Sequence, residues 1–129
     1  MPEESSRDPV RASRAADEGR EALAQGNLNS AQDAFNRAVR ADSANPDAVA
    51  GLAEVAFERA RYVDALDYAR RAVALRPKTP RYHVILGDAY FKLLRYDEAL
   101  ASYQRARTLS PQDEGVKARI VRAEARLGK

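Results

Sequence analysis

The chain has 129 residues, of which 45% are apolar and 32% are charged, and its formal net charge is +3. This length and apolar content suit one folded domain with a core and argue against a disordered chain. Cysteine is absent, which excludes disulfides, thiolate metal sites and a cysteine nucleophile. No apolar run approaches the roughly 18 residues that would mark a membrane span. The acidic N-terminus lacks the apolar core of a secretory signal, so we expect a cytoplasmic protein.

The positive charge is concentrated at the C-terminal end. Residues 114–129 hold five of the 22 basic and two of the 19 acidic side chains, which leaves 17 of each in the rest. The broad basic surface of a nucleic-acid-binding protein is therefore not expected, and neither is a nucleic-acid partner. The abundance of arginine over lysine and of alanine indicates a bacterial genome of high GC content.

Taken in chain order, residues 1–10 show no periodicity and are expected to form a disordered leader, so the folded domain is expected to span 11–129. From there the chain repeats itself with a constant period, in three frames of equal length without insertions: 12–45, 46–79 and 80–113. Small residues recur at fixed positions of the frames, namely Gly19, Ala53 and Gly87 at position 8, Ala31, Ala65 and Ala99 at position 20, and Ala38, Ala72 and Ala106 at position 27. A fixed period of this length indicates stacked supersecondary units.

Each frame divides into two predicted helices. Asn45-Pro46 and Thr79-Pro80 place a capping side chain before a proline, the usual start of a helix. The second helices are expected to run for about twelve residues each. Their expected starts lie near Asn29, Val63 and Asp97.

The segment after the third frame is predicted to form one more helix, over 114–127. Ser110-Pro111 is expected to open it, with an acid at Asp113 that completes a capping box. Its apolar residues recur at helical spacing, at Val116, Ile120, Ala123 and Leu127. Because a repeat array needs a polar outer face at its end, we interpret this segment as a capping helix.

The frame resembles the tetratricopeptide repeat, whose pattern is W-x2-L-G-x2-Y followed by A, F and P. The third frame carries most of that pattern, with His83 in the tryptophan position and matches at Leu86, Gly87, Tyr90, Ala99, Tyr103, Ala106 and Pro111. The first frame departs most from it. The resemblance implies an all-α, right-handed superhelix (an α-solenoid) of three helix–turn–helix repeats with a C-terminal capping helix.

No catalytic constellation is found, so we expect neither an enzyme nor a cofactor or metal site. The single histidine, His83, stands where the family places a packing aromatic, and we interpret it as structural. Asp97 and Glu98 fall at the start of a predicted helix, where acids interact favourably with the helix dipole.

The resemblance implies instead a concave groove, lined by the first helices of the repeats, that binds a peptide or partner protein. Phe57 and Phe91 are expected to contact the ligand. Arg119, Arg122 and Arg126 are spaced at i, i+3 and i+7, so they share one helix face and are expected to meet acidic side chains. Carried over by position, the expected partner-binding residues are Arg20, Asp47, Glu54, Phe57, Glu58, Arg81, Val84, Asp88, Phe91, Lys92, Arg119, Arg122 and Arg126.

One ligand mode of the family is not expected. The two-carboxylate clamp for chaperone C-termini would fall at Ala16, Arg20, Gly51, Arg81 and Ile85. Only the two arginines suit that role, and both asparagines of the clamp are missing.

Two other hypotheses remain open. The chain could be an assembly subunit that self-associates through exposed apolar surface on its alanine-rich second repeat. It could also be the regulatory domain of a larger bacterial protein.

Overall fold

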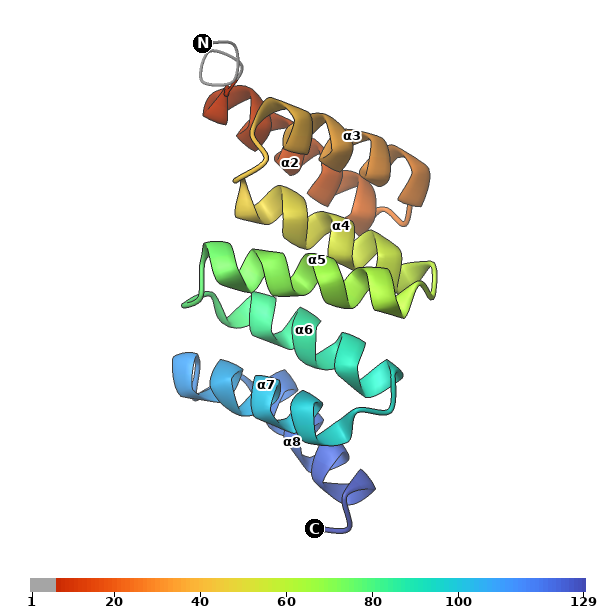
Figure 1. Cartoon of the computed structure of the whole chain (residues 1–129), viewed down its shortest axis with the longest axis vertical. Helices are drawn as coiled ribbons and strands as arrows, with labels where there is room; N and C mark the ends of the chain where they lie inside the picture. Colours follow the sequence, from red (N-terminus) through yellow and green to blue (C-terminus); the bar gives the residue numbers. More distant parts are fainter. Residues whose placement is uncertain (1–6) are drawn as a thin grey trace.

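The computed structural model describes residues 7–129, which form seven α-helices and no strand. In chain order these helices are α2 (Pro9–Ala24), α3 (Leu28–Ala41), α4 (Pro46–Glu58), α5 (Tyr62–Leu75), α6 (Pro80–Lys92), α7 (Tyr96–Leu109) and α8 (Glu114–Arg126). They pair as α2–α3, α4–α5 and α6–α7, and the pairs stack into an elongated array that α8 closes at the C-terminal end (Figure 1). The predicted all-α architecture of three helical pairs and a final helix is confirmed.

The first helix begins earlier than expected. Asp8 caps α2 by accepting a hydrogen bond from the Arg11 amide at 3.0 Å, and Pro9 occupies the first turn. Residues 9 and 10, which were expected in the disordered leader, therefore belong to a helix, while residues 1–6 lie outside the described part of the chain. The start was missed because Asp8-Pro9 lies ahead of the first repeat frame, which begins at residue 12.

The last helix begins at Glu114, the first residue of its predicted range, but the residue that caps it differs from the expectation. Its cap is Asp113, whose carboxylate accepts a hydrogen bond from the Val116 amide at 3.1 Å, and Ser110 and Pro111 lie in the preceding turn. Asp113 stands one full repeat after Thr79, the N-cap residue of α6. The capping residue of α8 therefore lies where the repeat register places it, at Asp113, and Pro111 follows the end of α7.

The turn that ends the first helix of each repeat, and the turn that ends α8, share one conformation. Their central residue adopts a positive φ, and this residue recurs once per repeat, at Gly26 (78°), Ala60 (61°), Leu94 (64°) and Gly128 (75°). The next amide donates back to a carbonyl earlier in the helix, as in Arg95 N–H to Tyr90 O at 2.9 Å. This is the Schellman arrangement, which satisfies the free carbonyls at a helix end.

Glycines let aromatic rings lie directly on the helix backbone. A β-carbon at Gly87 would lie 2.5 Å from the Tyr103 ring, and one at Gly19 would lie 2.6 Å from the Phe35 ring. A β-carbon at Gly51 would also overlap the Phe35 ring. Gly51 therefore packs under this ring instead of serving as the groove position at which the family comparison placed it. Because no side chain fits at these points, the glycines set how closely the helices approach.

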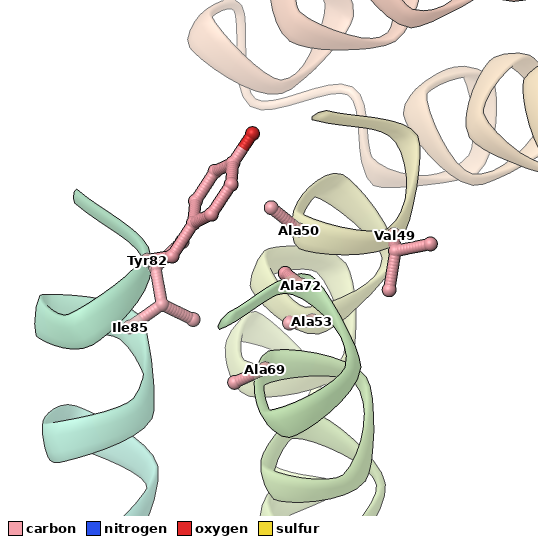
Figure 2. Packing of buried hydrophobic residues seen from close by; sticks show 7 residues of the cluster. All are labelled: Val49, Ala50, Ala53, Ala69, Ala72, Tyr82 and Ile85. Carbon is pink, nitrogen blue, oxygen red and sulfur yellow. The ribbon is translucent and has the colours of Figure 1, made fainter. Parts of the chain in front are cut away.

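In the second repeat, Ala53 stands at the position of Gly19 and Gly87, and Ala69 stands at the position of the rings of Phe35 and Tyr103. Tyr82 of α6 packs against these alanines. Ala53, Ala69 and Ala72 are fully buried around it in one cluster. Figure 2 shows the Tyr82 ring on α6 facing Ala50 and Ala72 across the interface between the second and third pairs. Ala50, Ala53, Ala69 and Ala72 of this repeat are thus core residues, whereas its Ala60 and Ala74 are exposed, as are Val63 and Leu75 of α5. Self-association through this repeat stays a prediction.

Substitution of Gly87 by alanine should lower the free energy of unfolding by about 2–3 kcal/mol, because the added carbon overlaps the Tyr103 ring. Urea unfolding followed by circular dichroism measures this. Gly115→Ala is the matched control, since its nearest neighbours would be side-chain ends of Asp113 and Arg119 at 3.2 and 3.4 Å. Equal losses in both variants would contradict the proposed packing.

Leu94→Gly should raise the free energy of unfolding by about 1 kcal/mol, because a leucine in the left-handed region is strained. The Leu94 side chain is 70% exposed, so little burial is lost. The same glycine substitution at Ala101, exposed in the helical backbone of α7, should cost about 1 kcal/mol instead. Destabilisation by Leu94→Gly would show that the leucine makes a contact that outweighs the strain.

Candidate functional site

Two adjoining hollows lie along the first helices of the repeats. The larger, of about 550 Å³, is lined by Leu23, Gly26, Leu28, Glu54, Phe57, Glu58, Ile85, Asp88 and Arg119. The smaller, of about 210 Å³, is lined by Phe57, Asp88, Phe91, Lys92, Tyr103, Arg119 and Arg122. Because Phe57, Asp88 and Arg119 line both, they form one continuous depression, which we call the groove.

Most of the predicted partner-binding residues meet there. Eight of them line the groove: Glu54, Phe57, Glu58, Asp88, Phe91, Lys92, Arg119 and Arg122. Arg126 lies over the Phe91 ring, next to the smaller hollow. Arg20, Asp47 and Arg81 form an ion network with Glu54 instead of lining the hollows. Val84 packs against the cluster between α7 and α8.

The ion network fixes α6 against α4. The Arg81 guanidinium lies 2.8 Å from Glu54 Oε1 and 3.4 Å from Asp47 Oδ1, and the Tyr82 hydroxyl donates a short hydrogen bond to Asp47. Burial lowers the pKa of Arg81, but Glu54, Asp47 and Tyr82 together raise it, with a net rise. Burial and the bond to Asp47 raise the pKa of Tyr82 far above its usual range. Arg81 is therefore already neutralised by the protein's own carboxylates.

Asp88 makes the equivalent bridge among α6, α7 and α8. Its carboxylate accepts a hydrogen bond from the Tyr103 hydroxyl at 2.6 Å and two from Arg119, at 2.9 and 3.3 Å. Burial, together with the bond to Asp88, raises the pKa of Tyr103. Burial lowers the pKa of Arg119 and the Asp88 pair raises it, with a net rise. The charge of Arg119 is thus paired with Asp88, and its guanidinium bridges α8 to α6.

Aromatic pairs repeat along the groove. Phe57 meets Tyr62 edge to face at a centroid distance of 5.4 Å, and Phe91 meets Tyr96, the same pair one repeat later, at 5.1 Å. The corresponding residues of the first repeat are Leu23 and Leu28, which line the larger hollow. The groove therefore carries an apolar strip along its length.

Cations of α8 cover the C-terminal end of this strip. The guanidinium carbons of Arg122 and Arg126 lie 5.0 and 5.4 Å from the Phe91 ring centroid, a cation–π geometry. Arg126 also donates a hydrogen bond to the Tyr96 hydroxyl at 3.1 Å. Among residues 7–129, no carboxylate forms an ion pair with Arg122, Arg126 or Lys92.

Some lining residues were missed from the sequence. Gly26, Leu28 and Tyr103 reach the hollows although they belong to turns or second helices. Leu28, Tyr62 and Tyr96 share frame position 17, shortly after the turn. That recurrence is the signal that could have placed them beside the apolar strip.

His83, Asp97 and Glu98 do not line the groove. His83 is buried, and its Nε2 lies 2.7 Å from the Pro77 carbonyl oxygen. Asp97 and Glu98 lie in the first turn of α7, as predicted, where Glu98 pairs with Arg95. Within residues 7–129, no group of three or more metal-ligating side chains comes together. None of the helices described combines the length and hydropathy needed to cross a membrane.

Comparison with known proteins identifies the repeat. The family model described as "Anaphase-promoting complex, cyclosome, subunit 3" matches residues 24–106. The chain therefore belongs to this family of tetratricopeptide-repeat proteins, and the resemblance seen in the sequence is confirmed. No curated protein matches the chain significantly.

Solved structures share the fold at low sequence identity. The first TPR of Spaghetti (RPAP3), bound to the HSP90 peptide SRMEEVD, superposes with a TM-score of 0.90 at 23% identity over 96% of this chain and 98% of its own. The Sgt2 TPR domain from Aspergillus fumigatus gives 0.85 at 20% identity, covering 95% and 82%. The second TPR domain of human RPAP3, in complex with the HSP70 peptide SGPTIEEVD, gives 0.81 at 20% identity, covering 89% and 96%.

Stability should fall at alkaline pH. The raised pKa values of Tyr82 and Tyr103 in the folded chain mean that their contribution is complete below about pH 10, the unfolded value, and is lost as the pH rises further. Urea unfolding at pH 8, 9.5, 10.5 and 11 should show this loss, and Tyr82→Phe/Tyr103→Phe should flatten it. Tyr68→Phe is the control, and a double variant with the same slope as this control would contradict the prediction.

Proposed function

We propose that this chain is a non-enzymatic protein-interaction module whose groove holds a segment of a partner protein. The observation that carries the proposal is the apolar strip in the groove: Phe57 borders both hollows, and Phe91 continues the strip into the second. Half-buried aromatics in a concave surface are the residue types that dominate binding at protein interfaces. The groove is large enough for several side chains of an extended or helical segment.

The solved structures support the same class of function. Two of them were determined with chaperone peptides, SRMEEVD and SGPTIEEVD. A chaperone C-terminus is nevertheless not the ligand that we propose here. Arg20 and Arg81, the basic residues in the clamp positions, both pair with Asp47, and Arg81 also pairs with Glu54. A ligand carboxylate would have to break these pairs to replace them.

Several other expectations from the sequence remain predictions. They are the absence of catalysis, the bacterial origin, the cytoplasmic location, and the possibilities that the chain self-associates or regulates a larger protein. A groove that binds a partner segment is compatible with each of these predictions.

Peptides selected from a random displayed library against the folded chain should bind in the groove. In ¹⁵N–¹H correlation spectra they should shift the amides of α4, α6 and α8 around the hollows. Phe57→Ala/Phe91→Ala should weaken their binding about tenfold or more, because both aromatic contacts are lost.

The matched control is Val63→Ala/Leu75→Ala, which removes exposed apolar side chains of α5. Circular dichroism melting should first show that both variants fold. Selected peptides that shift only α3, α5 or α7, or that bind the phenylalanine variant as tightly as the original chain, would refute a groove site.

A further inference from the structure

Charges without ion-pair partners divide the groove into two ends of opposite sign. Glu58, Lys92 and Arg126 occupy frame position 13 of three successive first helices, each one full repeat after the last, so the sign at this position changes along the array. We call Lys92, Arg122 and Arg126 the basic end. Within the described residues, the salt bridges of the groove involve none of these three cations and do not involve Glu58.

The basic end is arranged to receive carboxylates. Stacking on Phe91 holds the guanidinium groups of Arg122 and Arg126 in place while their N–H edges stay free for an acceptor. Arg122 donates no hydrogen bond to another described residue, and Arg126 donates one, to Tyr96. Because these side chains are already oriented, little rotamer freedom would be lost when they bind an anionic group. Lys92, on the rim of the same hollow, adds a third positive charge.

The larger hollow has the opposite character. Of its three carboxylates, Glu54 and Asp88 are paired with arginines, which leaves Glu58 as the exposed one. Its walls are apolar, built from Leu23, Leu28, Phe57 and Ile85. A lysine or arginine side chain fits this combination, because its aliphatic stem packs on apolar surface while its charged head stays hydrated next to a carboxylate.

We propose that the groove selects a segment carrying charges of both signs, with acidic side chains at the basic end and a lysine or arginine in the larger hollow. This inference rests on the proposed function and names the chemistry of its ligand. A uniform polyanion such as a nucleic acid is disfavoured, because the carboxylate of Glu58, which no described ion pair neutralises, lies in the same groove and would repel it. A uniformly acidic peptide meets the same repulsion.

Four labelled synthetic peptides of equal length test the inference. They share their apolar residues and differ only in charge: lysines then glutamates, the reverse order, lysines at both ends, and glutamates at both ends. Fluorescence anisotropy at low salt should show one of the two mixed peptides binding about tenfold tighter than both uniform ones. The preferred order reports the direction of the bound segment. The difference should shrink as salt is raised to physiological strength.

Charge reversal assigns the effect to the basic end. Arg122→Glu/Arg126→Glu should lose the preference for the mixed peptide and bind the all-lysine peptide more tightly than the original chain does. Arg105→Glu/Arg107→Glu, two exposed arginines of α7, makes the same change in net charge and should alter the affinity for the mixed peptide by less than about twofold. Melting curves establish that each variant folds.

The outcomes separate this inference from the proposed function. Equal binding of all four peptides, tightest binding of a uniform peptide, or an equal loss in the α7 control would overturn the charge selectivity. Uncharged library peptides that bind tightly in the groove would overturn it too, and they would leave the proposed function standing. If neither library nor designed peptides shift the groove amides, both proposals fail.

Discussion

The carboxylate of Asp88 joins three helices, and the shape of the groove depends on it. It projects from α6 and accepts hydrogen bonds from Tyr103 of α7 and Arg119 of α8. A buried or half-buried carboxylate without such donors would be costly, so the three groups stabilise one relative placement of the helices. Within residues 7–129, no second helix pairs with α8 as α3, α5 and α7 pair with their first helices, and this bridge adds a directional contact to its apolar stripe of Val116, Ile120 and Ala123. The position of the cations over Phe91 follows from that placement.

The same chemistry divides the charged residues of the concave face into two functional groups. Asp47, Glu54 and Arg81 neutralise one another between α4 and α6, and their contribution is to helix stacking. Lys92, Arg122 and Arg126 lack such carboxylate partners within the described residues and remain available to a ligand. Residues that a position-by-position comparison treats alike are thus separated by their contacts. For this reason the clamp arginines of the family pattern and the basic end are different sites with different expected ligands.

The sequence contained most of the architecture, because a fixed repeat period constrains where helices begin, end and meet. Gly87 recurs as a small residue at position 8 of the frames, but the sequence does not show that the Tyr103 ring packs on it. The start of α2 could not be placed, since Asp8-Pro9 is out of register with the frames. The family register also brought most of the predicted residues to the groove. It could not show that Arg119 would pair with Asp88, or that Val84 would pack toward α7 and α8. Both outcomes depend on side-chain contacts between different helices, which the repeat register does not specify.

Amide hydrogen exchange in Asp88→Ala tests most directly whether this carboxylate holds α8 and the groove in place. We expect amides of α8 (Glu114–Arg126) to lose protection strongly, while those of α4 and α5, which within the described residues form no hydrogen bond or ion pair with Asp88, keep theirs. Unchanged protection in α8 would mean that the apolar stripe alone fixes the last helix. Asp88 would then have no part in positioning the cations over Phe91, and the central claim about the groove would be contradicted.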